Sequence, residues 1–261
     1  MSSDMIAAFA LEAEVYDVLP FRVGQPDVGF FADLAEETGG PVLELACGTG
    51  RITLPVARAA GEAVGIDLAP AMLDRARAKA KDEGLEGAVS FVEGDMCTAR
   101  LDREFPLVMM GGQPLFFLKD DDALSAALET VRAHVAPGGR WAAGVPVLRA
   151  PAAADMQNRL HFTCEVRHPV SGQRVAIWDA SSIDEVRQIA TRRRITETLD
   201  EEGLVLERRH STQTLYYRHP AELRRLIEQA GFRLEHTYGG YDKRPFGSAS
   251  NHLVWVATKE D

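Results

Sequence analysis

The stretch 42-VLELACGTGR-51 decides the predicted fold, because an apolar run leads directly into a glycine-rich bend. Val42 to Ala46 are mostly apolar, as expected of a strand that is buried in a parallel sheet. Gly48 and Gly50 follow at once, and glycine accepts positive φ and leaves the backbone bare. A strand that ends in such a turn and continues into a helix is typical of the ligand-binding edge of an α/β sheet.

On both sides of this stretch, short apolar runs alternate with helical patterns, which predicts β-α-β units around a parallel sheet. Glycine or proline ends each predicted helix: Gly61, Gly84 and Pro137 stop the first three, and Gly231 stops the last. The predicted helices cover residues 52–61, 69–84, 121–139 and 219–231, and the predicted strands cover residues 42–46, 62–67, 88–95, 106–111, 140–147, 232–241 and 251–259.

The pattern changes between these two parts of the chain. Residues 160–217 read as three or four β-segments, with turn signals at 168–173 and 199–204. We therefore expect an antiparallel sheet at 150–217, inserted into a larger domain made of residues 1–149 and 218–261. The small-residue stretch 149–155 is the expected linker.

The glycine turn does not fit the dinucleotide pattern GxGxxG, since Thr53 stands where the third glycine would be. Asp67 ends the next predicted strand, where a carboxylate can accept hydrogen bonds from both hydroxyls of a ribose. Nicotinamide sites share that acid, so a nicotinamide-dependent oxidoreductase stays an alternative.

The run from Glu44 to Gly50 resembles motif I of the class I S-adenosylmethionine-dependent methyltransferases. GDM at 94–96 is similar to another element of that family, in which Asp95 would contact the adenine amino group. The resemblance implies an α/β fold with a Rossmann-like seven-stranded methyltransferase sheet, helices on both faces and the inserted antiparallel β-sheet. It also implies S-adenosyl-L-methionine as cofactor and S-adenosyl-L-homocysteine as product. Ala46 departs from the family, whose commonest residue there is glycine.

Near the N-terminus, Tyr16 and Asp17 resemble a pair that small-molecule methyltransferases carry in a helix before motif I. By this resemblance Tyr16 would cover the methionine end of the cofactor and Arg22 would pair with its carboxylate; the alternative is a surface helix with Tyr16 at the core edge. Arg51 either pairs with the same carboxylate of the cofactor or only faces solvent at the start of its helix. The full predicted cofactor site is Tyr16, Arg22, Glu44, Ala46, Gly48, Gly50, Arg51, Asp67, Leu68, Met72, Asp95, Met96 and Met110.

The C-terminal stretch 239–259 resembles the last hairpin of bacterial small-molecule methyltransferases, including amino-sugar N,N-dimethyltransferases. In that group the inserted sheet covers the substrate site and helps to pair subunits, which implies a lid and a possible homodimer here. The predicted catalytic residues are Tyr16, Gln113, His161 and Tyr216. Phe116 or Phe117 would accompany Gln113, and Trp178, His210 and Tyr217 could also project into the pocket, although such side chains more often serve packing.

Composition limits the partners. A net charge of −10 and a pI near 5.2 disfavour nucleic acid, and the basic run TRRRIT (191–196) is expected on the solvent face of a strand. The three cysteines, Cys47, Cys97 and Cys164, predict neither a disulfide framework nor a metal site. The N-terminus lacks the basic residues of a signal peptide and no long apolar run follows, so we expect a cytoplasmic protein that does not bind membranes.

The expected reaction is methyl transfer to nitrogen or oxygen of a small-molecule acceptor. The methyl carbon of a sulfonium is already electrophilic, so the main task is to hold the nucleophile in line with it. This chemistry needs neither a metal nor a covalent residue. Since the sequence offers no obvious general base, a non-catalytic S-adenosylmethionine-binding module is a further alternative.

Overall fold

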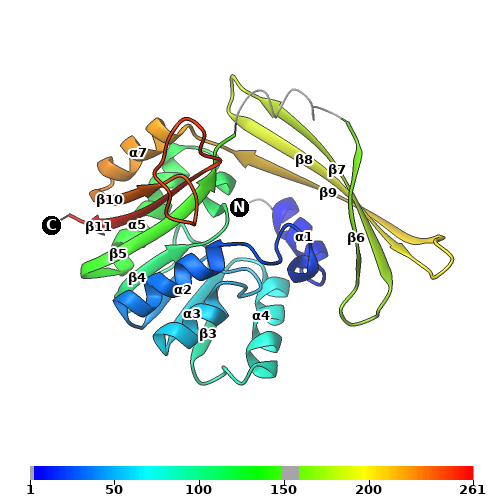
Figure 1. Cartoon of the computed structure of the whole chain (residues 1–261), viewed down its shortest axis with the longest axis horizontal. Coiled ribbons are helices and arrows are strands. Elements are labelled where there is room, and N and C mark those ends of the chain that lie inside the picture. The colour runs from blue at the N-terminus through cyan, green and yellow to red at the C-terminus, as the bar shows by residue number, and fades with distance from the viewer. Residues whose placement is uncertain (1–2, 149–158, 261) are drawn as a thin grey trace. The chain divides into compact units, whose positions relative to one another are not determined.

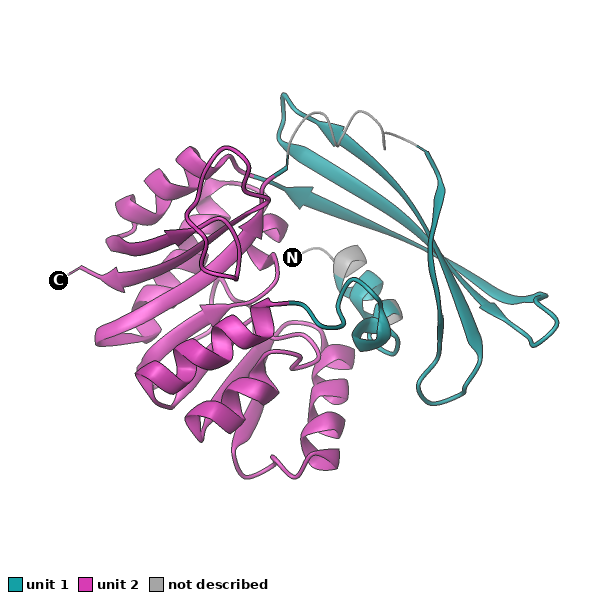
Figure 2. Ribbon diagram, in the orientation of Figure 1, with its two compact units in different colours: residues 1–25, 148–217 teal, residues 26–147, 218–261 magenta. Residues whose placement is uncertain are grey.

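The computed structural model describes residues 3–148 and 159–260 (Figure 1). The chain forms two compact units (Figure 2). The larger contains residues 26–147 and 218–261, and the smaller contains residues 1–25 and 148–217. The N-terminal residues thus group with the inserted sheet, whereas the sequence had placed them with the larger domain. The expected linker lies outside the described residues.

The larger unit is built on a seven-stranded sheet with the order β10-β11-β5-β4-β1-β2-β3. The strands β1 to β5 run parallel, and β11 is antiparallel to both of its neighbours. The predicted α/β fold is confirmed. The strands are β1 (Val42–Leu45), β2 (Ala63–Asp67), β3 (Val89–Glu93), β4 (Phe105–Met110), β5 (Val135–Pro146), β10 (Phe232–Tyr238) and β11 (His252–Lys259).

Helices connect these strands (Figure 1). The connection from β1 to β2 moves across the sheet in one direction and that from β4 to β5 in the other, so right-handed crossovers place their helices on opposite faces. On one face of the sheet the core contains Phe31, Val56, Met109 and Val254. A separate aromatic cluster is formed by Trp141 with Trp255 and Phe232. The helices are α2 (Asp27–Thr38), α3 (Thr53–Ala60), α4 (Pro70–Asp82), η2 (Pro114–Phe117), α5 (Asp121–His134) and α7 (Pro220–Gln229).

Local signals set most helix ends, with two corrections. Gly61 caps α3 with φ 83°, and Pro70 begins α4. The helix before Pro137 ends three residues earlier than the proline, and β5 already begins at Val135, well before the predicted start. Tyr16 lies not in an α-helix but in a single 3₁₀ turn, because Leu19 precedes a proline and is extended.

The smaller unit contains an antiparallel four-stranded sheet in sequential order, which confirms the predicted meander. Val15 and Leu19 cover one face of it, where they pack on Cys164 and Ile177. Among the described residues, no helix combines the length and apolar character needed to cross a membrane. The elements are α1 (Ser3–Glu12), η1 (Tyr16–Val18), β6 (His161–Arg167), β7 (Arg174–Asp184), β8 (Ile189–Leu199) and β9 (Val205–Tyr216).

Candidate functional site

The turn after β1 presents bare backbone at the carboxyl edge of the seven-stranded sheet. Gly48 and Gly50 have φ of 55° and 72°, as predicted. A Cβ on Gly48 would meet nothing within 4 Å, whereas one on Gly50 would lie 3.1 Å from Phe91 Cζ. Gly50 is therefore required by packing as well as by φ. Gly48 instead faces open space, so a ligand can approach its backbone.

Ala46 adopts φ 60° although it carries a side chain. This conformation costs an L-residue about 1 kcal/mol relative to glycine. A glycine at position 46, which is the commonest residue there in the methyltransferases that this stretch resembles, would adopt this φ without that cost.

Asp67 is tied to the glycine turn. Its Oδ2 accepts a hydrogen bond from the Gly48 amide at 2.8 Å, and its Oδ1 accepts one from the Ala69 amide at 2.9 Å. Burial raises the pKa of the carboxyl above its usual value. Each oxygen has a second lone pair, so the oriented carboxylate can still accept hydroxyl donors.

Asp95 follows β3 and caps its own turn by accepting a hydrogen bond from the Cys97 amide at 2.8 Å. Burial, with the Asp95 charge beside it, raises the pKa of the Cys97 thiol to about 11. The strands β1, β2 and β3 are neighbours and parallel. Gly48, Asp67 and Asp95 therefore meet at one edge, as the sequence predicted.

Glu44 is a predicted cofactor residue that lies buried in β1, with 2% of its surface exposed. It accepts a hydrogen bond from the Thr53 hydroxyl. Burial raises its pKa to about 8, against the lowering effect of the Thr53 bond and the Arg51 charge. The Thr53 hydroxyl has a partner within this core, which is a physical reason for threonine where a dinucleotide pattern needs glycine.

Sequence reasoning missed Asp27, the buried first residue of α2. Arg51 donates to both of its carboxylate oxygens, at 2.8 and 2.6 Å. This pair corrects the solvating role considered for Arg51, because the guanidinium engages Asp27. The two residues are far apart in sequence, so no local motif signals their contact. The contact of Arg51 with the cofactor carboxylate stays a prediction.

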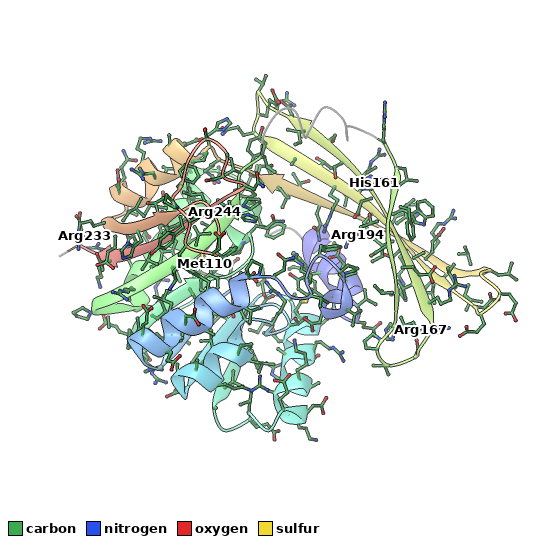
Figure 3. All side chains as sticks on the ribbon, in the orientation of Figure 1. Met110, His161, Arg167, Arg194, Arg233 and Arg244 are labelled. Carbon is green, nitrogen blue, oxygen red and sulfur yellow. The ribbon has the colours of Figure 1, made fainter. Side chains whose placement is uncertain are left out.

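The remaining predicted cofactor residues of the larger unit differ in exposure. Leu68 is half-buried beside Asp67, and Met96 is 9% exposed. Met72 and Met110 are 2% and 0% exposed, and Figure 3 labels Met110 within the larger unit. These two methionines are core residues and offer almost no surface to a ligand.

Tyr16 and Arg22 belong to the smaller unit. The Arg22 guanidinium carbon lies 4.6 Å from the centre of the Tyr16 ring, within range of a cation–π contact. It also lies 5.8 Å from the ring centre of Phe21. The proposed contacts of Tyr16 and Arg22 with the cofactor stay predictions.

The predicted acceptor residues near β4 separate into core and surface. Gln113 precedes η2 and is half-buried, as is Phe117. Phe116 is only 2% exposed and therefore belongs to the core. Of the two phenylalanines considered, Phe117 alone keeps surface for an acceptor.

The insert residues do not share one face. His161 pairs with Asp179, whereas Trp178 is opposite Ile195, which in turn faces His210. Because side chains alternate along a strand, His161 lies on the face of Asp179. Trp178 and His210 lie on the other face, and Tyr216 shares it by the same alternation. Trp178 donates to Glu197 at 3.0 Å, so it has a structural partner.

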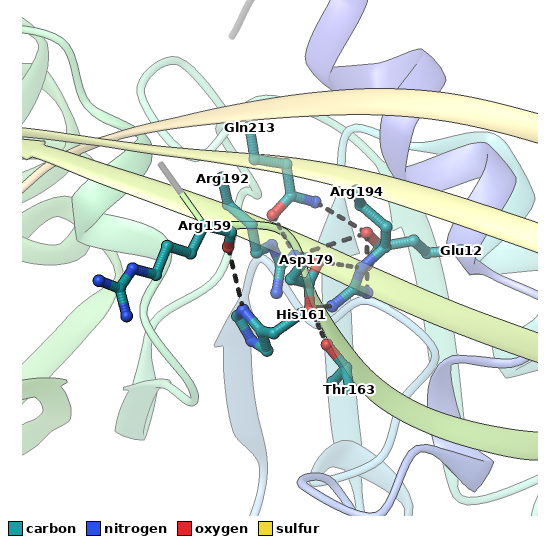
Figure 4. Close-up of polar contacts among 8 residues, drawn as sticks. All are labelled: Glu12, Arg159, His161, Thr163, Asp179, Arg192, Arg194 and Gln213. Carbon is teal, nitrogen blue, oxygen red and sulfur yellow. Dashed lines mark hydrogen bonds and ion pairs between the residues drawn. The ribbon is translucent and has the colours of Figure 1, made fainter. Parts of the chain in front are cut away.

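The basic run 191–196 lies in β8 and is only partly solvent-facing, which corrects the prediction. Figure 4 shows the polar contacts of Arg192 and Arg194. Arg194 is 2% exposed and donates to both oxygens of Asp179 at 2.8 Å. It also pairs with Glu12 of α1 at 3.1 Å, and Glu12 pairs with Arg192 at 3.4 Å. Glu12 and Asp179 therefore offset the charges of Arg192 and Arg194, which share this face of β8.

Comparison with known proteins agrees with this fold. Residues 42–139 match a family model described as a methyltransferase domain. The Cypemycin N-terminal methyltransferase of a Streptomyces species is 24% identical over 260 residues, which is 95% of each chain. The dTDP-3-amino-3,4,6-trideoxy-alpha-D-glucopyranose N,N-dimethyltransferase of Streptomyces venezuelae is 29% identical over 133 residues, or 49% of this chain and 54% of that protein.

The solved structure of the CcbJ methyltransferase from Streptomyces caelestis superposes on this chain with a TM-score of 0.79. It is 26% identical and the match covers 96% of both chains. The protein is a class I S-adenosylmethionine-dependent methyltransferase. Its cofactor is therefore S-adenosylmethionine and not a nicotinamide.

Proposed function

We propose that this methyltransferase transfers a methyl group to an amine nitrogen of a small molecule. Two relatives support nitrogen as the target: one is named for an N-terminus, the other for the N,N-dimethylation of an amino sugar. The observation that carries the cofactor half of the proposal is the open Gly48 backbone held by the Asp67 carboxylate.

The residue roles follow from this proposal. Asp67 accepts the ribose hydroxyls and Asp95 the adenine amino group, while Tyr16 and Arg22 serve the methionine end. Gln113 lies toward the acceptor, and His161 and Tyr216 are further candidates from the insert. The bound cofactor supplies an electrophilic methyl group; the chain's contribution is to orient the nucleophile and exclude water.

Calorimetric titration with S-adenosylhomocysteine tests the cofactor site. Asp67→Ala should weaken binding at least tenfold, because it removes the acceptor for the ribose and frees the Gly48 amide. Asp74→Ala is the matched control, since Asp74 is an exposed acid of the adjacent helix, with 76% of its side chain accessible. Equal affinities for the two variants would refute the assignment.

Mass spectrometry of an acceptor panel tests the reaction. The panel contains nucleotide-linked amino sugars, peptides with free N-termini, and phenols and alcohols of similar size. We expect methylated product only from the amines. Tight binding of S-adenosylhomocysteine without transfer to any of them would favour the non-catalytic alternative.

We also propose that the four-stranded sheet pairs two copies of the chain. Phe162 and Val205 are 52% and 47% exposed, and register places both on the face of Trp178. Light scattering should show a dimer that becomes a monomer in Phe162→Glu, while Val186→Glu at an exposed turn stays dimeric. A monomeric wild type would contradict the pairing. The expected cytoplasmic location also stays a proposal.

A further inference from the structure

His252 is a histidine that sequence reasoning passed over, and it lies at the same edge of the sheet as the glycine turn. It is the first residue of β11 and pairs with Pro146, the last residue of β5. Since β11 is antiparallel, its start lies at the edge where β5, β4 and β1 end. It lies two strands from β4, the strand that leads into the Gln113 segment.

The side chain of His252 points to the α2 side of the sheet. Val254 and Val256, which share its face by alternation, lie in the core with Phe30 and Phe31. The imidazole lies 5.7 Å from the ring centre of Tyr241. The start of α2 is therefore nearby in the same unit.

The charged groups around His252 come from two elements. Asp27 at the start of α2 acts on it electrostatically and favours the protonated ring, whereas Arg244 in the loop before β11 opposes protonation. Burial outweighs both and lowers the pKa of His252 below its ordinary 6.5. Asp27 is also the partner of Arg51, so one carboxylate connects the surroundings of the imidazole to the glycine turn.

The imidazole of His252 is available for a ligand. It is half-buried, and within residues 3–148 and 159–260 neither ring nitrogen has a hydrogen-bond partner. His134 shows the contrast, because its two ring nitrogens are bonded to Thr130 and Leu101 and are used by the fold. A neutral imidazole at the edge of a binding site can act as a general base.

We propose that His252 accepts the proton that the acceptor amine must lose, an inference that rests on the proposed amine specificity. An aliphatic amine is largely an ammonium ion at neutral pH and has no lone pair to donate. A ring nitrogen of His252 takes one N–H proton, and the freed lone pair forms the new N–C bond. The C–S bond breaks with its electron pair to sulfur, and the imidazolium then releases its proton to water.

Two variants test this role with the amine that the acceptor panel identifies. His252→Gln keeps a polar side chain but cannot take the proton, so kcat should fall about 100-fold. Affinity for S-adenosylhomocysteine should stay within twofold, which separates this result from failure of the cofactor site. Added imidazole should restore part of the rate in His252→Ala, which a purely structural role would not allow.

His236→Gln is the matched control. His236 lies on the neighbouring strand β10 and stacks on Tyr238 at 5.7 Å, but its side chain is exposed. It should keep the wild-type rate. A His252→Gln enzyme with a rate within twofold of wild type, or a His252→Ala enzyme that imidazole does not rescue, would overturn the proposal.

A further measurement needs no acceptor. NMR titration of the imidazole in the S-adenosylhomocysteine complex, assigned by loss of the signal in His252→Gln, should give a midpoint below 6.5. A midpoint above 7 would leave the ring protonated at neutral pH and unable to accept a proton, which would also overturn the proposal.

Discussion

Glu44→Gln is the substitution for which the structure gives the sharpest expectation. The carboxyl is buried in β1 and its pKa is raised from 4.5 to about 8. At neutral pH the folded protein therefore holds Glu44 protonated, whereas the unfolded chain ionises it. Glutamine resembles the protonated acid and can still accept the hydrogen bond of Thr53.

The sign and size of the effect follow from proton linkage. A carboxyl with a raised folded pKa binds more protons in the native state, so its stabilising contribution is full below pH 4.5 and is lost as the pH rises through 8. With these two values the loss between pH 6 and pH 9 is about 3 kcal/mol. Glutamine does not ionise, so the variant should not suffer this loss.

Urea unfolding between pH 6 and pH 9, followed by tryptophan fluorescence, measures the difference. The free energy of unfolding of Glu44→Gln, relative to wild type, should rise by about 3 kcal/mol over this range. Glu86→Gln, at an exposed position after α4, should follow the wild-type curve. A wild type and a Glu44→Gln variant with parallel curves would show that Glu44 is not a buried neutral acid.

Two further substitutions come with close controls. Gly48→Ala and Gly84→Ala both place a side chain at positive φ with nothing within 4 Å, so each should cost about 1 kcal/mol in a melting experiment. Only Gly48→Ala should also weaken S-adenosylhomocysteine binding. Equal binding by both variants would contradict the predicted contact between the Gly48 backbone and the cofactor. Glu12→Ala leaves the buried Arg194 short of a carboxylate and should cost about 3 kcal/mol in urea unfolding. Glu14→Ala, whose side chain is 69% exposed, should cost less than about 1 kcal/mol; similar losses for the two glutamates would argue against the buried network.

The sequence predicted those parts of the fold that depend on short-range backbone chemistry. The glycine turn, the Gly61 cap and the Pro70 start each follow from residues within one turn of the feature. The helix α2 was missed although its signal was present, since Phe30, Phe31 and Leu34 repeat at helical spacing after a proline.

The electrostatics of the site could not be read in the same way. The alternation in TRRRIT was correctly assigned to a strand, but only Glu12 and Asp179 decide which of its faces is buried. His252 carries no motif, and its neutrality depends on burial and on Asp27 and Arg244. Such contacts join residues from distant parts of the chain, so composition and spacing do not reveal them.

The charges at the carboxyl edge favour the substrate form of the cofactor over its product. Asp27 is paired with Arg51, and Glu44 is protonated at neutral pH, whereas the Asp67 carboxylate lies beside the glycine turn. S-adenosylmethionine carries one more positive charge than S-adenosylhomocysteine, because methyl transfer removes the sulfonium charge. A carboxylate at this edge attracts the methyl donor more strongly than the demethylated product, and salt should weaken binding of the donor more than that of the product. With the proposed role of Asp67, product release then depends on the same carboxylate that would accept the ribose hydroxyls, because the reaction itself removes part of the attraction.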